Sequence, residues 1–271
     1  MADGGGAGRG SVHRLARRLT AAGAETRDEV VAEEVAVALV YNGVSHAVMM
    51  ATPCDIEDFA RGFTLTEHLV ERPSEIFEID FEPVGRGIEV QLRIAGQRMA
   101  ALQERRRSLA GRTGCDLCGV DSLDAAMRPV PATRATARVS RAAITRAMAA
   151  LPGEQRINRY NGATHAAGWA TADGTLVAVR EDVGRHNALD KLAGALAKLD
   201  RQDDGGFVVV TSRCSYEMVQ KAAAIDAAAI AAVSAPTSLA IETAEQAGLA
   251  LVAFVRDNRL TVYAHSERIQ A

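Results

Sequence analysis

The feature of the sequence that most restricts the fold is an alternation of short apolar segments with amphipathic segments between residues 176 and 264. Residues 207–210 and 230–233 are apolar at every position, as is typical of strands that are buried on both faces of a sheet. Residues at helical spacing, from Leu189 through Leu192 and Leu196 to Leu199, predict an amphipathic helix between the expected strand at residues 176–179 and the one at residues 207–210. This alternation predicts an α/β fold in which helices cover a mainly parallel sheet.

Composition and the pattern of apolar residues divide the chain into four regions. Residues 1–28 are rich in Gly, Arg and Ala, and we expect a mobile tail. Residues 29–103 predict a smaller α+β module, because strand patterns flank a predicted helix and Asn42-Gly43 is typical of a type I′ hairpin turn. Residues 104–132 are expected to form an exposed loop segment. Residues 133–271 are expected to form a C-terminal α/β domain.

The expected elements have these bounds. Strands are expected over residues 35–41, 44–49, 75–81, 87–94, 176–179, 207–210, 230–233, 249–255 and 260–264. Helices are expected over residues 56–70, 141–151, 188–199, 215–229 and 236–247. Ser140 is a good N-cap for the second helix, and Gly248 is a good terminator for the last.

Charge and hydropathy narrow the functional classes. The formal net charge is -3, which disfavours bulk binding of nucleic acid, and no apolar run reaches the roughly 18 residues that span a bilayer. The first residues have no apolar core of a secretory signal, and four cysteines do not resemble a secreted disulfide framework. We therefore expect a cytoplasmic protein that acts on neither membranes nor nucleic acid.

The segment Gly114-Cys115-Asp116-Leu117-Cys118-Gly119 contains two of the four cysteines. Arginines precede it at positions 105, 106, 107 and 112, and nearby positive charge favours the thiolate that attacks sulfur. A thioredoxin-like site is disfavoured, since its CxxC would follow a strand and open a helix. A structural zinc site using these cysteines and His165 remains an alternative, although we predict no metal.

Three polar clusters follow predicted strands, at residues 181–187, 211–215 and 234–238. Carboxyl ends of parallel strands meet at one edge of a sheet, where helix N-termini favour anions. Arg185, His186, Ser212 and Arg213 therefore predict a site for a phosphate-bearing ligand. Taken singly, each of these residues is more simply explained as a helix cap or packed side chain, and Asp190 and Lys191 as solvated surface.

A zinc-dependent nucleobase deaminase would combine a CxxC with H-x-E. His165 is followed two positions later by Ala167, so the general acid/base glutamate is missing. The CxxC also precedes the histidine and lacks the proline of that signature. The deaminase chemistry is therefore excluded.

Several motifs together resemble the FdhD family of formate dehydrogenase accessory sulfurtransferases. They are Thr52-Pro53, Cys115-Asp116-Leu117-Cys118-Gly119, Thr164-His165-Ala166-Ala167, the run from Glu181 to Lys191, and Ser234-Ala235-Pro236-Thr237-Ser238. The resemblance implies a cytidine-deaminase-like three-layer core with a mixed sheet, and a homodimer. It also implies that sulfur from a cysteine desulfurase passes to bis-molybdopterin guanine dinucleotide, carrying molybdenum or tungsten, for the formate dehydrogenase catalytic subunit.

The resemblance also implies roles for individual residues. Cys115 would carry the persulfide, with Cys118 as an accessory thiol. The cofactor, bound as a substrate, would contact Phe254-Val255-Arg256-Asp257-Asn258-Arg259 as well as the strand-end clusters at Arg185 and Arg213. Asp116 stands where the family usually has glycine, and its charge disfavours the Cys115 thiolate. A cofactor-binding chaperone without sulfur chemistry remains the alternative function.

Overall fold

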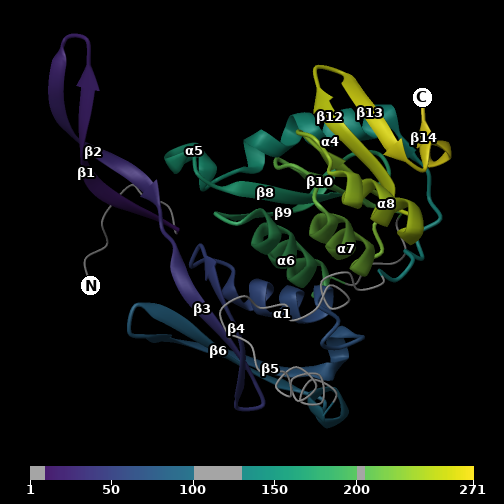
Figure 1. Cartoon of the computed structure of the whole chain (residues 1–271), viewed down its shortest axis with the longest axis horizontal. Coiled ribbons are helices and arrows are strands. Elements are labelled where there is room, and N and C mark those ends of the chain that lie inside the picture. Colours follow the sequence, from purple (N-terminus) through teal and green to yellow (C-terminus); the bar gives the residue numbers. More distant parts are fainter. Residues whose placement is uncertain (1–9, 101–129, 200–204) are drawn as a thin grey trace.

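A computed structural model describes residues 10–100, 130–199 and 205–271 of the chain. Its larger part is built around a six-stranded sheet with the order β13-β12-β11-β10-β8-β9 (Figure 1). The strands are β8 (His165–Ala170), β9 (Leu176–Asp182), β10 (Phe207–Val210), β11 (Ala229–Ala232), β12 (Ala250–Arg256) and β13 (Arg259–Ala264). β10, β11 and β12 are parallel, whereas β8, β9 and β13 pair antiparallel with their neighbours. The sheet is therefore mixed, as expected.

Helices cover both faces of this sheet. The helices are α4 (Arg141–Glu154), α6 (Arg185–Leu196), α7 (Tyr216–Ala224) and α8 (Ser238–Ala247). α4 packs on one face with Phe207 and Val209, and the other three pack on the opposite face with Val208 and Val210. All four residues of β10 are buried, which explains its uninterrupted apolar sequence. The three-layer α/β core is confirmed, whereas the closer likeness to cytidine deaminases stays a prediction.

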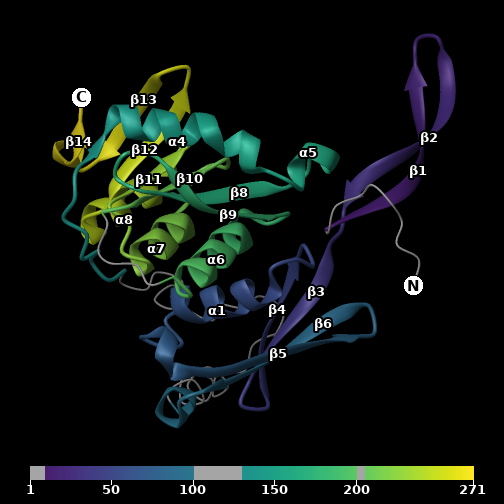
Figure 2. The same ribbon diagram turned by 180° about the vertical axis from the view of Figure 1, so that it is seen from behind.

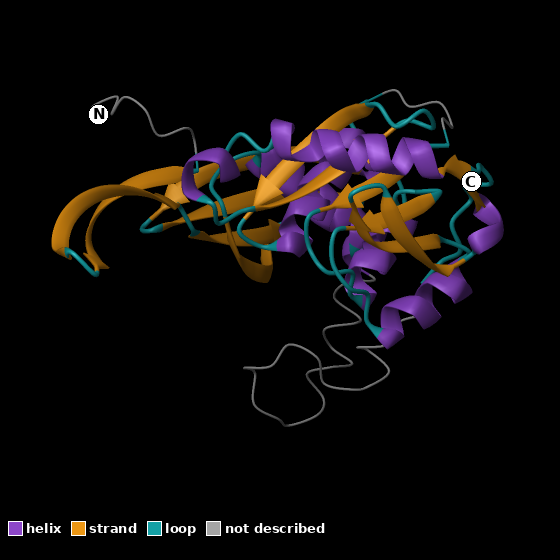
Figure 3. Ribbon diagram, turned by 90° about the horizontal axis from the view of Figure 1, so that it is seen from above, coloured by secondary structure: helices purple, strands orange, loops and turns teal. Residues whose placement is uncertain are grey.

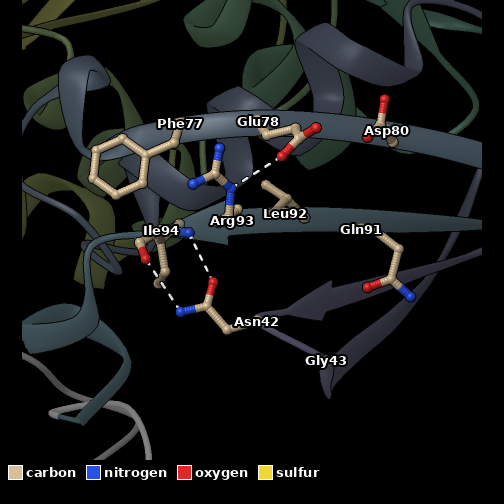
Figure 4. Close-up of a pocket in the computed structure, with 9 residues that line it drawn as sticks. All are labelled: Asn42, Gly43, Phe77, Glu78, Asp80, Gln91, Leu92, Arg93 and Ile94. Carbon is tan, nitrogen blue, oxygen red and sulfur yellow. Dashed lines mark hydrogen bonds and ion pairs between the residues drawn. The ribbon is translucent and has the colours of Figure 1, made fainter.

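The N-terminal module has a four-stranded sheet with the order β4-β3-β6-β5, seen below the larger sheet in Figure 1. Its elements are β3 (Val35–Tyr41), β4 (Val44–Ala51), α1 (Ile56–Thr66), β5 (Ile76–Val84) and β6 (Gly87–Ile94). Asn42 and Gly43 have φ values of 47° and 80°, so the predicted I′ hairpin turn is confirmed. The Asn42 amide also donates to the Ile94 carbonyl and accepts from the Ile94 N–H (Figure 4). These two hydrogen bonds hold the hairpin turn against the end of β6.

The module joins the larger domain where α1 crosses α6. A Cβ added at Gly62 would lie 1.7 Å from the Asp190 carbonyl oxygen, and one added at Gly194 would lie 1.9 Å from that of Asp58. The two helix backbones therefore touch, and only glycine fits at either position. Figure 2 shows the same layering from behind, with α1 against α6.

A mobile tail was expected over residues 1–28, and the part that the structure describes, from residue 10 onward, forms regular strands. β1 (Ser11–Thr20) and β2 (Gly23–Ala32) pair antiparallel over their full length and form an arm that projects from the body (Figures 1 and 3). Its polar and apolar residues do not alternate, because neither face of the arm is buried. The pattern that normally reveals a strand is therefore missing.

Several further short elements are also described. β7 (Val139–Ser140) pairs with β14 (Ile269–Gln270), α5 (Asn158–Asn161) precedes β8, and two 3-10 turns span Pro73–Glu75 and Ser266–Arg268. Ser140 caps α4 as predicted, accepting from the Ala143 N–H. Among the helices formed by the described residues, none is long and apolar enough to cross a membrane.

Candidate functional site

The carboxyl ends of four strands meet at one edge of the large sheet. β9, β10, β11 and β12 run in the same direction, and β8 runs against them. Because β8 runs the opposite way, its first residues lie at the same edge, and His165 there pairs with Asp182. The Thr211 N–H donates to the Ala166 carbonyl, which fixes the loop after β10 beside β8. The predicted clusters at 181–187, 211–215 and 234–238 all follow strands that end here, and we call this the ligand edge.

His186 lies at the ligand edge, in the first turn of α6. Its Nε2 lies 2.8 Å from the Glu217 carboxylate and 3.3 Å from Ser215 Oγ. Ser215 is the N-cap residue of α7, yet its hydroxyl does not cap that helix. The side chains of α6 and α7 thus converge where α7 begins, at the positive end of its dipole.

The Arg185 guanidinium is incompletely satisfied. Its Nε is screened from solvent and has no hydrogen-bond partner among the described residues. An unsatisfied N–H of a cation in this position costs free energy, unless an anion approaches it. Arg185 therefore fits a phosphate or carboxylate ligand.

His165 belongs to the same group of side chains. Burial, followed by the positive charges of Arg185 and His186, lowers the pKa of His165 below its ordinary 6.5. The pKa of Glu217 is also lowered, chiefly by its hydrogen bond to His186, and for this carboxyl group the lower pKa favours the charged form. The cationic side chain of Arg185 at the ligand edge therefore favours a bound anion.

Ser212 and Arg213 lie on the loop after β10. Ser212 is buried and donates its hydroxyl hydrogen bond to the Arg213 carbonyl, 2.8 Å away, whereas Arg213 is exposed. The next residue, Cys214, is pinned to the loop after β11, because its N–H donates to the Ala235 carbonyl and its carbonyl accepts from Thr237. Burial raises the pKa of Cys214 to about 12, so this thiol is unreactive.

The two ends of the segment from Phe254 to Arg259 lie in different parts of the molecule. Phe254 has a φ of 53°, and its N–H donates to the Ser234 carbonyl, so it lies at the ligand edge. Beyond it the β12–β13 hairpin turns toward the α4 face, where Arg141 of α4 donates to the Asn258 carbonyl. Within one chain, the structure does not bring Arg256 and Arg259 together with Arg185 and His186, which begin α6 on the opposite face.

The family-like run from Glu181 to Lys191 is mostly structural. Asp182 and Lys191 form a fully buried ion pair, and both also bond to the backbone of Thr52 in the N-terminal module. Asp190 pairs with Lys221 and accepts from Thr66. The suggestion that Asp190 and Lys191 are solvated surface is therefore wrong, since they are 1% and 0% exposed.

A third inter-module contact was missed by reasoning from the sequence. Asp58 of α1 is 4% exposed and pairs with Arg180 and Lys198. A charged residue inside the apolar face of a predicted helix was the signal that could have indicated it. These contacts fix α6, and therefore its first residues Arg185 and His186, relative to both sheets.

Two large cavities among the described residues are lined by neither Arg185 nor His186. One of about 420 Å³ lies on the N-terminal sheet, where Arg93 pairs with Glu78 beside Phe77 (Figure 4). Another of about 740 Å³ lies along the free side of β9 and includes Cys54, whose pKa is raised by burial. We locate the site at the ligand edge, because unsatisfied and charged groups gather there.

Cys115 and Cys118 lie outside the described residues. Among the residues that are described, there is no group of three or more His, Cys, Asp or Glu side chains placed to hold a metal ion. The zinc alternative for the CxxC therefore stays untested.

Residues 32–270 match the model of the FdhD/NarQ family. The chain is 56% identical over 243 residues to a sulfur carrier protein FdhD from Cupriavidus necator, covering 90% of this chain and 84% of that protein. It is 51% identical over 248 residues to a sulfur carrier protein FdhD from Bordetella petrii, covering 92% and 89%. A crystal structure from Desulfotalea psychrophila, provisionally described as a formate dehydrogenase accessory protein, superposes with a TM-score of 0.73. That protein is 25% identical, and the match covers 96% of this chain and 99% of that one.

Proposed function

Since this chain belongs to the FdhD/NarQ family, we propose that it is a sulfur carrier in the maturation of formate dehydrogenase. The observation that carries the proposal is the similarity to proteins named sulfur carriers over nine-tenths of the chain. The sequence supplies the chemistry, because the CxxC offers two thiols that follow a run of arginines.

Sulfur transfer begins with attack by the Cys115 thiolate on the outer sulfur of a persulfide on a cysteine desulfurase. A bond forms between Cys115 and that sulfur, the donor's S–S bond breaks, and the donor leaves as a thiolate. No external oxidant is needed, since the transferred sulfur keeps its oxidation state. Cys118 can later attack Cys115 and release the sulfur as sulfide, with the two electrons coming from formation of a Cys115–Cys118 disulfide.

The acceptor is bis-molybdopterin guanine dinucleotide, carrying molybdenum or tungsten and bound as a substrate. Arg185 fits one of its phosphates, because a planar guanidinium with an unsatisfied Nε makes charge-assisted hydrogen bonds to phosphate oxygens. His186, Ser212 and Arg213 lie at the same ligand edge, and Phe254 is 47% exposed there and available to a base.

Arg256 and Arg259 form a second cationic position, on the hairpin that turns toward α4. The cofactor has two guanosine diphosphate ends, so two separated cationic positions suit it better than one. We further propose that the protein acts in the cytoplasm and assembles as a homodimer. It delivers the loaded cofactor to the formate dehydrogenase catalytic subunit.

Complementation of a strain that lacks this protein tests the carrier function. Wild-type protein should restore formate dehydrogenase activity, and Cys115→Ala should not. Cys54→Ala is the matched control, because burial raises the pKa of that thiol and should keep it out of sulfur chemistry. Full activity with Cys115→Ala would contradict the carrier function.

The ligand edge also supports a second function, that of a chaperone that binds the cofactor without sulfur chemistry. Its anion-binding groups include neither cysteine of the CxxC. A double Cys115→Ala, Cys118→Ala variant separates the two functions, since a chaperone would keep full activity and a carrier would lose it.

A further inference from the structure

The contact between the Glu217 carboxylate and the His186 ring lies where the proposed ligand's phosphate would bind. Glu217 is in the first turn of α7, and its carboxylate is 2.8 Å from His186 Nε2. Ser215 Oγ approaches the same nitrogen at 3.3 Å. A negatively charged oxygen thus already occupies the position between the start of α6 and the start of α7.

The two members of the pair differ in how firmly they are held. The Glu217 side chain is 56% exposed, whereas that of His186 is 27% exposed. An exposed glutamate can rotate into water at little cost, since surface ion pairs contribute little net free energy. His186 is held by α6, which the buried Asp182–Lys191 and Asp190–Lys221 pairs fix in place. The Glu217 carboxylate can therefore move away from His186, whereas His186 stays in place.

A phosphate would satisfy more of the surrounding groups than Glu217 does. Arg185 Nε still has no partner among the described residues, and Ser215 does not cap its own helix. His165, Arg185 and His186 place their positive or ionisable groups close enough to influence one another. A phosphate has several acceptor oxygens and up to two charges, so it can accept from Arg185, His186 and Ser215 together.

We propose that Glu217 is an internal competitor for the ligand edge, holding His186 in the free protein and leaving when a phosphate of the ligand binds. The inference rests on the proposed function, because it takes the nucleotide end of the cofactor as the ligand. Weak monoanions cannot displace a carboxylate that is tethered beside His186, whereas a phosphate that also binds Arg185 can. Glu217 thereby makes the edge selective for phosphate-bearing ligands.

Calorimetry with guanosine diphosphate at pH 7 and low salt tests the competition. Glu217→Gln removes the competing charge and should tighten binding about three- to tenfold. Glu242→Gln is the matched control, because it removes an exposed charge from α8, the neighbouring helix, without contacting His186, and it should leave the affinity unchanged. Glu217→Ser should behave as Glu217→Gln does, which excludes an effect of the new amide.

A second readout follows the His186 ring by NMR. In wild-type protein, guanosine diphosphate should shift both the His186 ring nitrogens and the Glu217 carboxyl carbon. Weaker or unchanged binding in Glu217→Gln overturns the inference but leaves the nucleotide site standing. If neither wild-type protein nor any variant binds the nucleotide, the nucleotide site of the proposed function fails, and the inference fails with it. Neither result depends on Cys115.

Discussion

The carboxylate of Asp182 and the ammonium of Lys191 lie 2.7 Å apart, and neither side chain is exposed to solvent. The Thr52 N–H donates to Asp182, and Lys191 donates to the Thr52 carbonyl, so the pair joins the N-terminal module to the domain of the six-stranded sheet. A buried charge is tolerated only with its partner. The pair therefore makes the position of α6 depend on the N-terminal module.

Lys191→Met should destabilise the protein, because it leaves Asp182 buried without a counter-charge. We expect the free energy of unfolding to fall by about 3–5 kcal/mol, measured by urea denaturation. Arg93→Met is the control, since the Arg93–Glu78 pair is exposed and should cost less than about 1 kcal/mol. A similar loss in both variants would show that burial of the Asp182–Lys191 pair is unimportant.

The helix crossing gives a second prediction. Gly62→Ala places a methyl group against the Asp190 carbonyl and should lower the free energy of unfolding by about 3 kcal/mol or more. Gly153→Ala is the control, because it lies in α4 with open space around its Cβ and should be neutral or stabilising. Equal stability of the two variants would contradict the close contact of α1 and α6.

His165 gives a prediction about pH. Its folded pKa is below the ordinary 6.5, so in the window just below pH 6.5 the unfolded chain binds more protons than the folded one. Stability should therefore fall as the pH is lowered through that window, and His165→Gln should flatten the slope. Urea denaturation between pH 5 and 7.5 measures it, and an equal slope in both proteins would contradict the prediction.

Much of the fold could be predicted from the sequence, because burial leaves periodic patterns. The uninterrupted apolar run of β10 and the Asn42-Gly43 turn both indicated the correct structure. The arm of β1 and β2 could not be predicted, since no buried face imposes an alternation on it. The ligand edge was predicted through Arg185 and His186, but Glu217 was not. Its pairing with His186 depends on how α6 and α7 pack, which local spacing does not reveal.

The arm itself can be tested by hydrogen exchange. Leu15 and Leu19 are 81% and 73% exposed, so the arm buries little apolar surface. Because an isolated hairpin is marginally stable, amides of residues 14–29 should exchange far faster than those of β10. Slow exchange along the arm would mean that another molecule covers it.

The two cationic positions proposed for the nucleotide ends can be separated by mutation. Arg185→Ala should weaken binding of guanosine diphosphate by roughly ten- to a hundredfold, as expected for loss of a charge-assisted hydrogen bond in a partly buried site. A double Arg256→Ala, Arg259→Ala variant should lose nucleotide binding at the hairpin position and keep it at the Arg185 position. Calorimetry should show this loss as a lower number of nucleotides bound per chain. Unchanged stoichiometry and affinity in the double variant would place the nucleotide elsewhere.

Mass spectrometry tests most directly whether Cys115 carries sulfur. Purified protein is incubated with cysteine and a cysteine desulfurase, alkylated and digested. The mass added to each of its four cysteines is then compared. We predict one added sulfur atom on Cys115 in wild-type protein, and none on Cys54 or Cys214, whose pKa values are raised by burial. Wild-type protein that gains no sulfur on Cys115, while the desulfurase itself is loaded, would contradict a sulfur-carrier role for Cys115.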